Sequence, residues 1–344
     1  MKFLKGLLFF AFISLSVATN AQDIHFTQFY LTPLNTNPAY TGAFEGTFRL
    51  SGIYRDQFAG VLNSNPFRTP SFGVDAPLIK GLGKRDWIGV GGVFLSDKAG
   101  TLGLGSSKFM GSIAYHLALD KKANSVLTFG LQGGSVSYSL SNPLEAQDEN
   151  SISTGTAPVI YGTDQNNLSS SAFDLNFGVL LRTQMNKTTR LELGVALNHL
   201  TSPDYFLLNT NNENTEGAQL PANFDLHGQF FIDIGEKFTL KPAFLYQQIA
   251  GANEIMIHAL GGYNLNEEKE IDLNFGIGYR LRDATKFIVG MDYGPFKVGA
   301  AYDLTISDLR DATSSANGFE LAATYVAAIF KKPDVKPVIF CPRF

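Results

Sequence analysis

The chain has 344 residues, of which 44% are hydrophobic and 17% are charged, and its formal net charge is −4. This charged fraction is low for a soluble protein of such length, and the acidic balance gives no indication of a nucleic-acid partner. The single cysteine excludes both a disulfide framework within the chain and a cysteine-rich metal site.

The first 21 residues have the pattern of a secretory signal peptide. Lys2 and Lys5 supply a positive start, and a mostly apolar run over 7–18 follows that is too short to cross a membrane as a helix. Residues 19–21 form a plausible cleavage site before Gln22. No later stretch is apolar enough for a membrane helix, so an exported chain of this kind is expected in an outer membrane.

Residues 22–43 form a leader before the first expected strand. Pro33 and Pro38 interrupt any long strand there. The leader is nevertheless rich in large apolar side chains, namely Phe26, Phe29, Tyr30, Leu31 and Tyr40. This content favours a segment packed inside or under the β-barrel that the following residues predict.

From residue 44 to residue 330, apolar residues alternate with polar or small ones, most regularly over 269–329. Ile271, Leu273 and Phe275, for example, alternate with Asp272 and Asn274. A period of two places successive side chains on opposite faces of a strand. Because the apolar face continues strand after strand while the other face holds Gly, Asp, Arg and Lys, the pattern is typical of a transmembrane β-barrel.

We therefore expect an all-β fold, a transmembrane antiparallel barrel of about 14 strands. The strands are predicted near 44–55, 69–76, 86–96, 106–119, 124–138, 171–184, 189–201, 222–234, 237–248, 253–264, 269–282, 285–293, 296–307 and 318–330. Connections after even-numbered strands are mostly short, whereas the long ones follow odd-numbered strands. Since outer-membrane barrels have short periplasmic turns and longer outer loops, both termini, including a tail at 331–344, are expected in the periplasm.

A barrel of this size cannot fill its lumen with wall side chains alone. Water, loops, the leader or a partner must therefore occupy it. The charged residues expected to face the lumen are Asp174, Arg182, Asp225, Asp272, Arg280, Arg282, Lys297, Asp303 and Glu320.

Signals of catalysis are weak throughout the sequence. The five histidines lie in separate segments, and neither an H-E-x-x-H nor a G-x-S-x-G pattern occurs. We expect no enzymatic activity, no cofactor and no metal site. Cys341 in the tail is expected to be either a free periplasmic thiol or a partner contact.

The leader and first strand resemble the opening of the PorP/SprF family of outer-membrane proteins of the Bacteroidetes. The resemblance rests on Gln22-Asp23, on Phe26-Thr27-Gln28-Phe29-Tyr30, on the run from Pro33 to Gly42, and on Tyr54-Arg55-Asp56-Gln57-Phe58. Family members often have Trp where Phe58 stands. Near the end of the chain, Gly318-Phe319-Glu320-Leu321 and the last four residues also match.

The resemblance implies a non-enzymatic role in the type IX secretion system and, in some members, in gliding motility. The implied partners, besides outer-membrane lipid, are a large secreted adhesin with a type IX C-terminal secretion domain and other type IX components. The leader is expected to plug the lumen or to reach a periplasmic partner. Partner-binding candidates are Phe29, Tyr30, Pro33, Asn37, Pro38, Tyr40, Gly42 and Arg55. The alternative is a porin or a channel for hydrophobic solutes.

Overall fold

A computed structural model describes residues 24–57, 67–80, 85–99, 104–140, 168–205, 218–249, 252–307, 310 and 316–329. The predicted signal peptide at 1–21 and the predicted tail at 331–344, with Cys341, lie outside the described residues.

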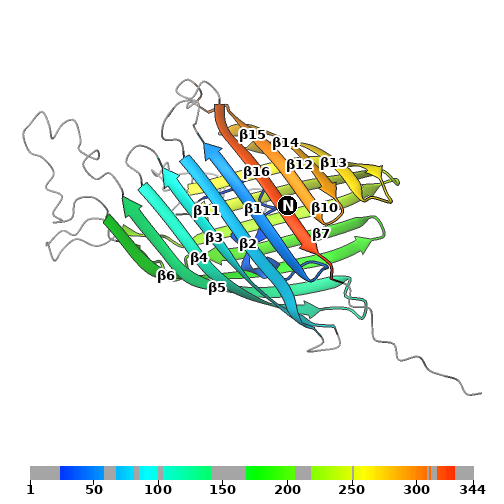
Figure 1. Ribbon diagram of the computed structural model, residues 1–344, viewed down its shortest axis with the longest axis horizontal. Coiled ribbons are helices and arrows are strands. Elements are labelled where there is room, and N and C mark those ends of the chain that lie inside the picture. Colours follow the sequence, from blue (N-terminus) through cyan, green and yellow to red (C-terminus); the bar gives the residue numbers. More distant parts are fainter. Residues whose placement is uncertain are drawn as a thin grey trace, which may run out of the picture.

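The strands close into one antiparallel barrel (Figure 1). The barrel strands are β1 (Phe48–Gln57), β2 (Phe67–Lys80), β3 (Trp87–Ala99), β4 (Leu104–Ala118), β5 (Ser125–Leu140), β6 (Leu168–Asn186), β7 (Thr189–Asn198), β10 (Asn223–Ile234), β11 (Phe238–Ile249), β12 (Ala252–Asn266), β13 (Ile271–Arg280), β14 (Ala284–Tyr293), β15 (Phe296–Thr305) and β16 (Ala316–Ala327). The prediction of a 14-stranded barrel is confirmed.

Each barrel strand pairs with the strand before and after it, and β1 closes the barrel by pairing with β16. The short strands β8 (Asp204–Tyr205) and β9 (Ala218–Gln219) form a separate pair within the connection between β7 and β10. Closure satisfies the hydrogen-bonding groups that an edge strand would leave unpaired in a membrane.

Several strand bounds differ from the expectation by a few residues, and β2 for example runs to Lys80 rather than to residue 76. The first strand begins at Phe48 rather than at residue 44, because residues 43–47 still belong to the bend that enters it. The prediction that Arg282 faces the lumen is wrong. Strand β13 ends at Arg280, and Arg282 is an exposed turn residue with φ of 61°.

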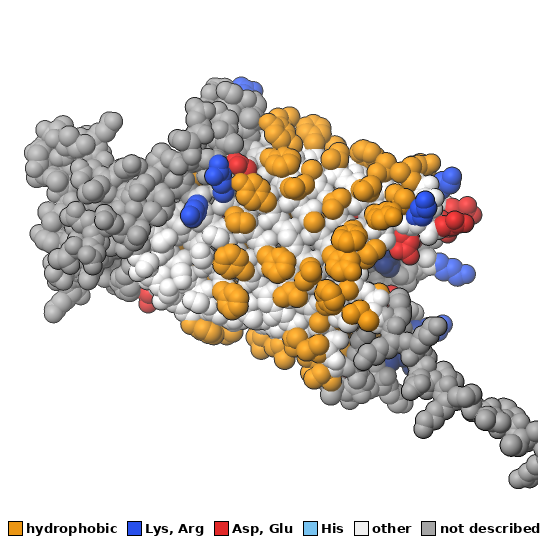
Figure 2. All heavy atoms as spheres, viewed as in Figure 1, with side chains coloured by type: hydrophobic (Ala, Val, Ile, Leu, Met, Phe, Trp, Pro, Cys, Tyr) orange, Lys and Arg blue, Asp and Glu red, His pale blue; other side chains and the backbone are white. Residues whose placement is uncertain are grey.

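The outer wall is apolar, as the alternation predicts. Large hydrophobic side chains on the outward phase remain exposed, with Ile277 at 63% and Phe275 at 57%. Figure 2 shows such side chains across the visible wall, whereas charged side chains in this view lie near the two ends. This distribution matches a hydrocarbon layer around the middle of the barrel and water at both ends.

The connections distinguish the two ends. We call the end with the short links at 187–188, 235–237, 267–270 and 294–295 the turn end. The opposite end, which holds Gln57, Leu140 and Asn198, the last residues of β1, β5 and β7, is the loop end. Strand β1 starts and β16 finishes at the turn end.

Candidate functional site

Residues 24–43, called the lumen segment below, lie inside the barrel. Figure 1 shows this blue segment behind β1 and β2, within the ring of strands. It contains two short 3-10 helices, η1 (Pro33–Asn35) and η2 (Pro38–Tyr40). Its side chains contact the inward phase of strands all round the wall, and most of its residues are buried. The segment therefore forms a large part of the hydrophobic core inside the barrel.

The segment runs along the lumen in one direction. His25 and Thr27 lie beside Arg55 and Glu320, which belong to the loop half of β1 and β16. At its other end the Gly42 carbonyl oxygen accepts a hydrogen bond from Nε1 of Trp87, the first residue of β3 at the turn end. The first described residues thus lie in the loop half, and the chain descends to the turn end before entering β1. The periplasmic position of both termini stays a prediction.

Buried charges hold the segment in the loop half. We call Arg55, Arg280, Lys286, Asp303 and Glu320 the charged cluster. Asp303 Oδ2 lies 3.6 Å from both Arg280 Nη2 and Lys286 Nζ and 3.9 Å from Arg55 Nη2. Burying these charges inside a membrane barrel costs desolvation energy. Their mutual pairing offsets part of that cost.

The backbone of the segment completes this charged cluster. The N–H of Thr27 donates to Glu320 Oε1 at 2.8 Å, and the N–H of Gln28 donates to Oε2 at 3.1 Å. Lys286 Nζ donates to the Thr27 hydroxyl at 2.7 Å, and Arg55 donates to the carbonyl oxygen of His25. The cluster is therefore a binding site for residues 25–28 rather than the lining of an open channel.

Aromatic and aliphatic contacts follow. Phe29 stacks on His258 with ring centroids 5.3 Å apart, and Tyr30 meets the same imidazole edge-on at 5.4 Å. Phe29 also packs on Ala243, Leu245 and Met256. Burial raises the pKa of the Tyr30 hydroxyl above its ordinary range, so it stays neutral.

Asn37 joins three strands. Its Nδ2 donates to the carbonyl oxygens of Val179 on β6 and Val195 on β7, at 3.2 and 3.1 Å, and lies 3.0 Å from Nε2 of His227 on β10. Its Oδ1 accepts from the N–H of Ala39 at 2.8 Å and so caps η2. One fully buried side chain thus orders the segment and attaches it to the wall.

Glycines on the inner wall allow the lumen segment to lie close to the strand backbone. A Cβ at Gly178 would overlap Asn37, a Cβ at Gly130 would overlap the Pro38–Ala39 backbone, and one at Gly89 would overlap Thr41. Gly42 adds a turn at φ of +71°, which L side chains rarely adopt. The wall and the segment therefore fit each other at the level of backbone contact.

Polar contacts fix the turn end of the segment. Asp75 Oδ2 accepts from the N–H of Gly42 and from Arg49 Nη2, both at 2.7 Å. Arg182 Nη1 donates to the carbonyl oxygen of Ala43 at 2.6 Å. The Tyr40 hydroxyl donates to Glu192 Oε2 at 3.2 Å. Burial first, and then the Glu192 charge, hold the Tyr40 pKa well above its usual value, so Tyr40 remains the donor.

All eight predicted partner-binding residues are thereby placed. Seven belong to the lumen segment, and the eighth, Arg55, contacts it. They are Phe29, Tyr30, Pro33, Asn37, Pro38, Tyr40, Gly42 and Arg55. The structure brings them together inside the barrel, and their role in binding a partner stays a prediction. The sequence did not single out the wall residues that contact the segment, namely Asp75, Trp87, His227 and Lys286. Its only indication of them was their position on the lumen-facing side of the alternating pattern.

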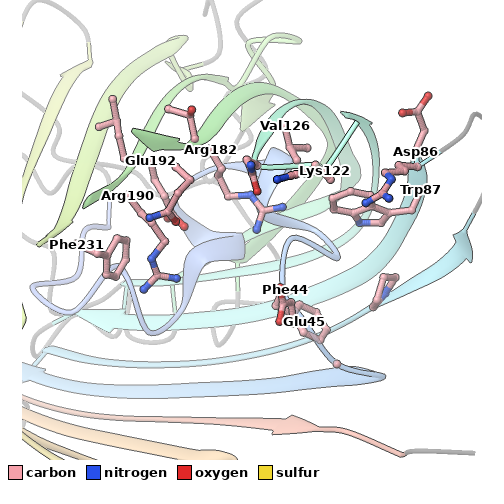
Figure 3. Close-up of a pocket in the computed structure, with 18 residues that line it drawn as sticks. Phe44, Glu45, Asp86, Trp87, Lys122, Val126, Arg182, Arg190, Glu192 and Phe231 are labelled. Atoms are coloured by element: carbon pink, nitrogen blue, oxygen red, sulfur yellow. The ribbon is translucent and has the colours of Figure 1, made fainter. Parts of the chain in front are cut away.

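A cavity of about 770 Å³ opens at the turn end, and we call it the turn-end cavity (Figure 3). Its lining includes four cationic residues, three carboxylates and three aromatic rings, namely Arg85, Lys122, Arg182 and Arg190, Glu45, Asp86 and Glu192, and Phe44, Trp87 and Phe231. A smaller cavity of about 180 Å³ shares Glu192 and Phe231 with it. These cavities border the exit of the lumen segment toward β1.

Within the described part of the chain, no group of His, Cys, Asp and Glu side chains is arranged to hold a metal ion. Among the described residues, no helix has the length and apolar character needed to cross a membrane.

The fold is similar to that of outer-membrane transporters of known structure. The toluene transporter TodX of Pseudomonas putida shares 10% identity with the chain at a TM-score of 0.51, over 92% of this chain and 97% of that one. The toluene transporter TbuX of Ralstonia pickettii shares 12% identity at a TM-score of 0.49, over 86% and 94%. Identities this low indicate a common fold only.

A search of curated proteins found no match. A family model described as "Type IX secretion system membrane protein PorP/SprF" matches residues 18–325, which include the lumen segment and almost the whole barrel. The protein is thus an outer-membrane β-barrel, and the chain belongs to the PorP/SprF family of type IX secretion system membrane proteins.

Proposed function

We propose that this barrel supports the export or surface anchoring of a large secreted adhesin by docking proteins rather than by conducting solutes or catalysing a reaction. The observation that carries the proposal is the lumen segment. Residues 24–43 contact the wall on strands all round the barrel and are fastened at both ends. A lumen so filled suits a rigid platform better than an open pore.

Family membership supports the type IX part of the proposal. In this proposal the adhesin presents its C-terminal secretion domain to the loop end or the barrel mouth. Loops on a rigid scaffold are the usual place for recognition. The similarity to hydrocarbon transporters concerns the fold alone, so it gives no support to a solute channel as the alternative.

The test is a pull-down of the tagged protein from native outer membranes in mild detergent, followed by mass spectrometry. We expect one very large secreted protein, or other type IX components, to co-purify. A matched preparation of a barrel lacking residues 24–42 should remain membrane-inserted but lose the partner. Recovery of the intact barrel alone would contradict the docking function.

A further inference from the structure

The turn-end cavity gathers four cationic side chains from separate parts of the wall. Arg85 precedes β3, Lys122 lies in the β4–β5 turn, and Arg182 and Arg190 stand on β6 and β7. Within the described part of the chain, none of the four forms a salt bridge. No direct ion pair therefore neutralises them, although the nearby charges of Glu192 and Glu45 also act on Arg182.

The carboxylates of the same cavity are largely engaged elsewhere. Asp86 accepts hydrogen bonds from the N–H of Ala118 at 2.9 Å and from the Tyr115 hydroxyl at 2.7 Å. These two bonds, the Ala118 bond first, lower the Asp86 pKa, so it stays ionised and bound to its own wall. Figure 3 shows its carboxylate directed away from the ring of lining side chains. Glu192 accepts a hydrogen bond from the Tyr40 hydroxyl. Glu45 is the third carboxylate that lines the cavity.

Arg182 is the best-placed anchor for an anion. One of its nitrogens donates to Ala43, while its Nε has no hydrogen-bond partner among the described residues. Its guanidinium lies 6.0 Å from the centre of the Trp87 ring. A partly buried guanidinium with an unused donor binds a carboxylate more strongly than an exposed one, because less water competes.

Aromatic rings stand beside these cations. Arg190 lies 4.9 Å from the centre of the Phe231 ring, and Phe44 lies in the bend between the lumen segment and β1. Figure 3 shows Arg182, Arg190, Trp87, Phe44 and Phe231 around one space. The site therefore brings cationic donors and aromatic rings together, and Trp87 is itself stacked on His116 with ring centroids 4.4 Å apart.

We propose that the turn-end cavity binds an acidic, extended peptide segment of a partner protein, with carboxylates on Arg182 and Arg190 and apolar side chains against Trp87 and Phe231. The cavity volume of about 770 Å³ suits a few residues rather than a folded domain. The cavity opens at an end of the barrel, which faces water and not hydrocarbon. This inference rests on the proposed function, because it gives the docking platform a second partner site opposite the loop end.

The test uses the purified full chain in detergent micelles and two fluorescein-labelled hexapeptides, one of alternating Glu and Leu and one in which Gln replaces Glu. Fluorescence anisotropy measures their binding. We expect the Glu peptide to bind, more weakly as salt rises, and the Gln peptide to bind at least about tenfold less well. Arg190→Gln should weaken binding of the Glu peptide about tenfold, because it removes a charge-assisted contact.

Arg190→Gln is the decisive variant, since Arg182→Gln also removes the bond to Ala43 and could disturb the lumen segment. Lys269→Gln is the matched control, because Lys269 lies in the β12–β13 turn at the same end and does not line the cavity. The proposed site would be refuted if both peptides bound equally well. It would also be refuted if Lys269→Gln weakened binding of the Glu peptide as much as Arg190→Gln does. If the pull-down finds no partner while the Glu peptide binds as expected, the proposed function fails and this site stands. If the pull-down finds a partner while the Glu peptide does not bind, the proposed function stands and the turn-end site is refuted.

Discussion

Asn37 Nδ2 lies 3.0 Å from Nε2 of His227, across a sequence separation of 190 residues, and this contact joins the lumen segment to the wall of β10. The same amide also reaches β6 and β7. Because several buried groups depend on one side chain, a single substitution at Asn37 removes several contacts of the segment at once.

Asn37→Ala should destabilise the protein by about 2–3 kcal/mol, since it leaves buried acceptors and the Ala39 N–H without their partner. Urea unfolding in lipid vesicles, followed by circular dichroism, measures this change. Asn253→Ala is the control, because Asn253 only accepts an exposed hydrogen bond from Tyr246. Equal stability of the two variants would show that Asn37 is not an anchor.

Gly130→Ala should displace the segment, since its new methyl group would overlap the Pro38–Ala39 backbone. Trp87 is the single tryptophan and donates to Gly42, so its emission reports on the segment. We expect a red shift as the indole becomes more exposed to water. Gly111→Ala is the matched control, because the nearest atom to a Cβ there is 3.9 Å away. A red shift in the control as well would refute the specific overlap.

Glu320→Gln should loosen residues 25–28, because a neutral amide binds the two backbone donors less strongly than the carboxylate does. Hydrogen exchange by mass spectrometry should show faster exchange in a peptide covering Thr27 and Gln28. A peptide covering Gly42, which Asp75 holds, should be unchanged. Faster exchange over the whole segment would mean that the charged cluster and the turn-end contacts do not act separately.

Removal of residues 24–42 should open the lumen, because wall side chains alone do not fill a barrel of this width. Planar-bilayer recordings should show stable conductance for the deletion and none for the intact chain. The same conductance in both proteins would favour the channel alternative.

Ile277→Arg should cost about 2–4 kcal/mol if the middle of β13 lies in the hydrocarbon, because that is the range for a cation at the midplane of an outer-membrane barrel. Ile277 is 63% exposed on the outward phase. Ile277→Leu controls for the loss of the native side chain. Unfolding in vesicles measures both, and a cost below 1 kcal/mol for Arg would place this residue outside the membrane.

The sequence by itself determined the barrel. Alternation over residues such as Phe275 and Ile277 predicts which face meets lipid, and the lengths of the connections predict which end of the barrel holds the short turns. The sequence placed strand ends less accurately, as Arg282 shows, because a turn with positive φ leaves no trace in a period-of-two pattern.

Only the tertiary structure decided what fills the lumen. The leader's aromatic content indicated packing, but not that Asn37 reaches His227, that Gly130 admits the Pro38–Ala39 backbone, or that Glu320 binds Thr27. These pairs lie far apart in sequence, and barrel closure sets their distances. Alternation specifies a face, whereas a contact inside a closed barrel depends on the register and tilt of every strand in between.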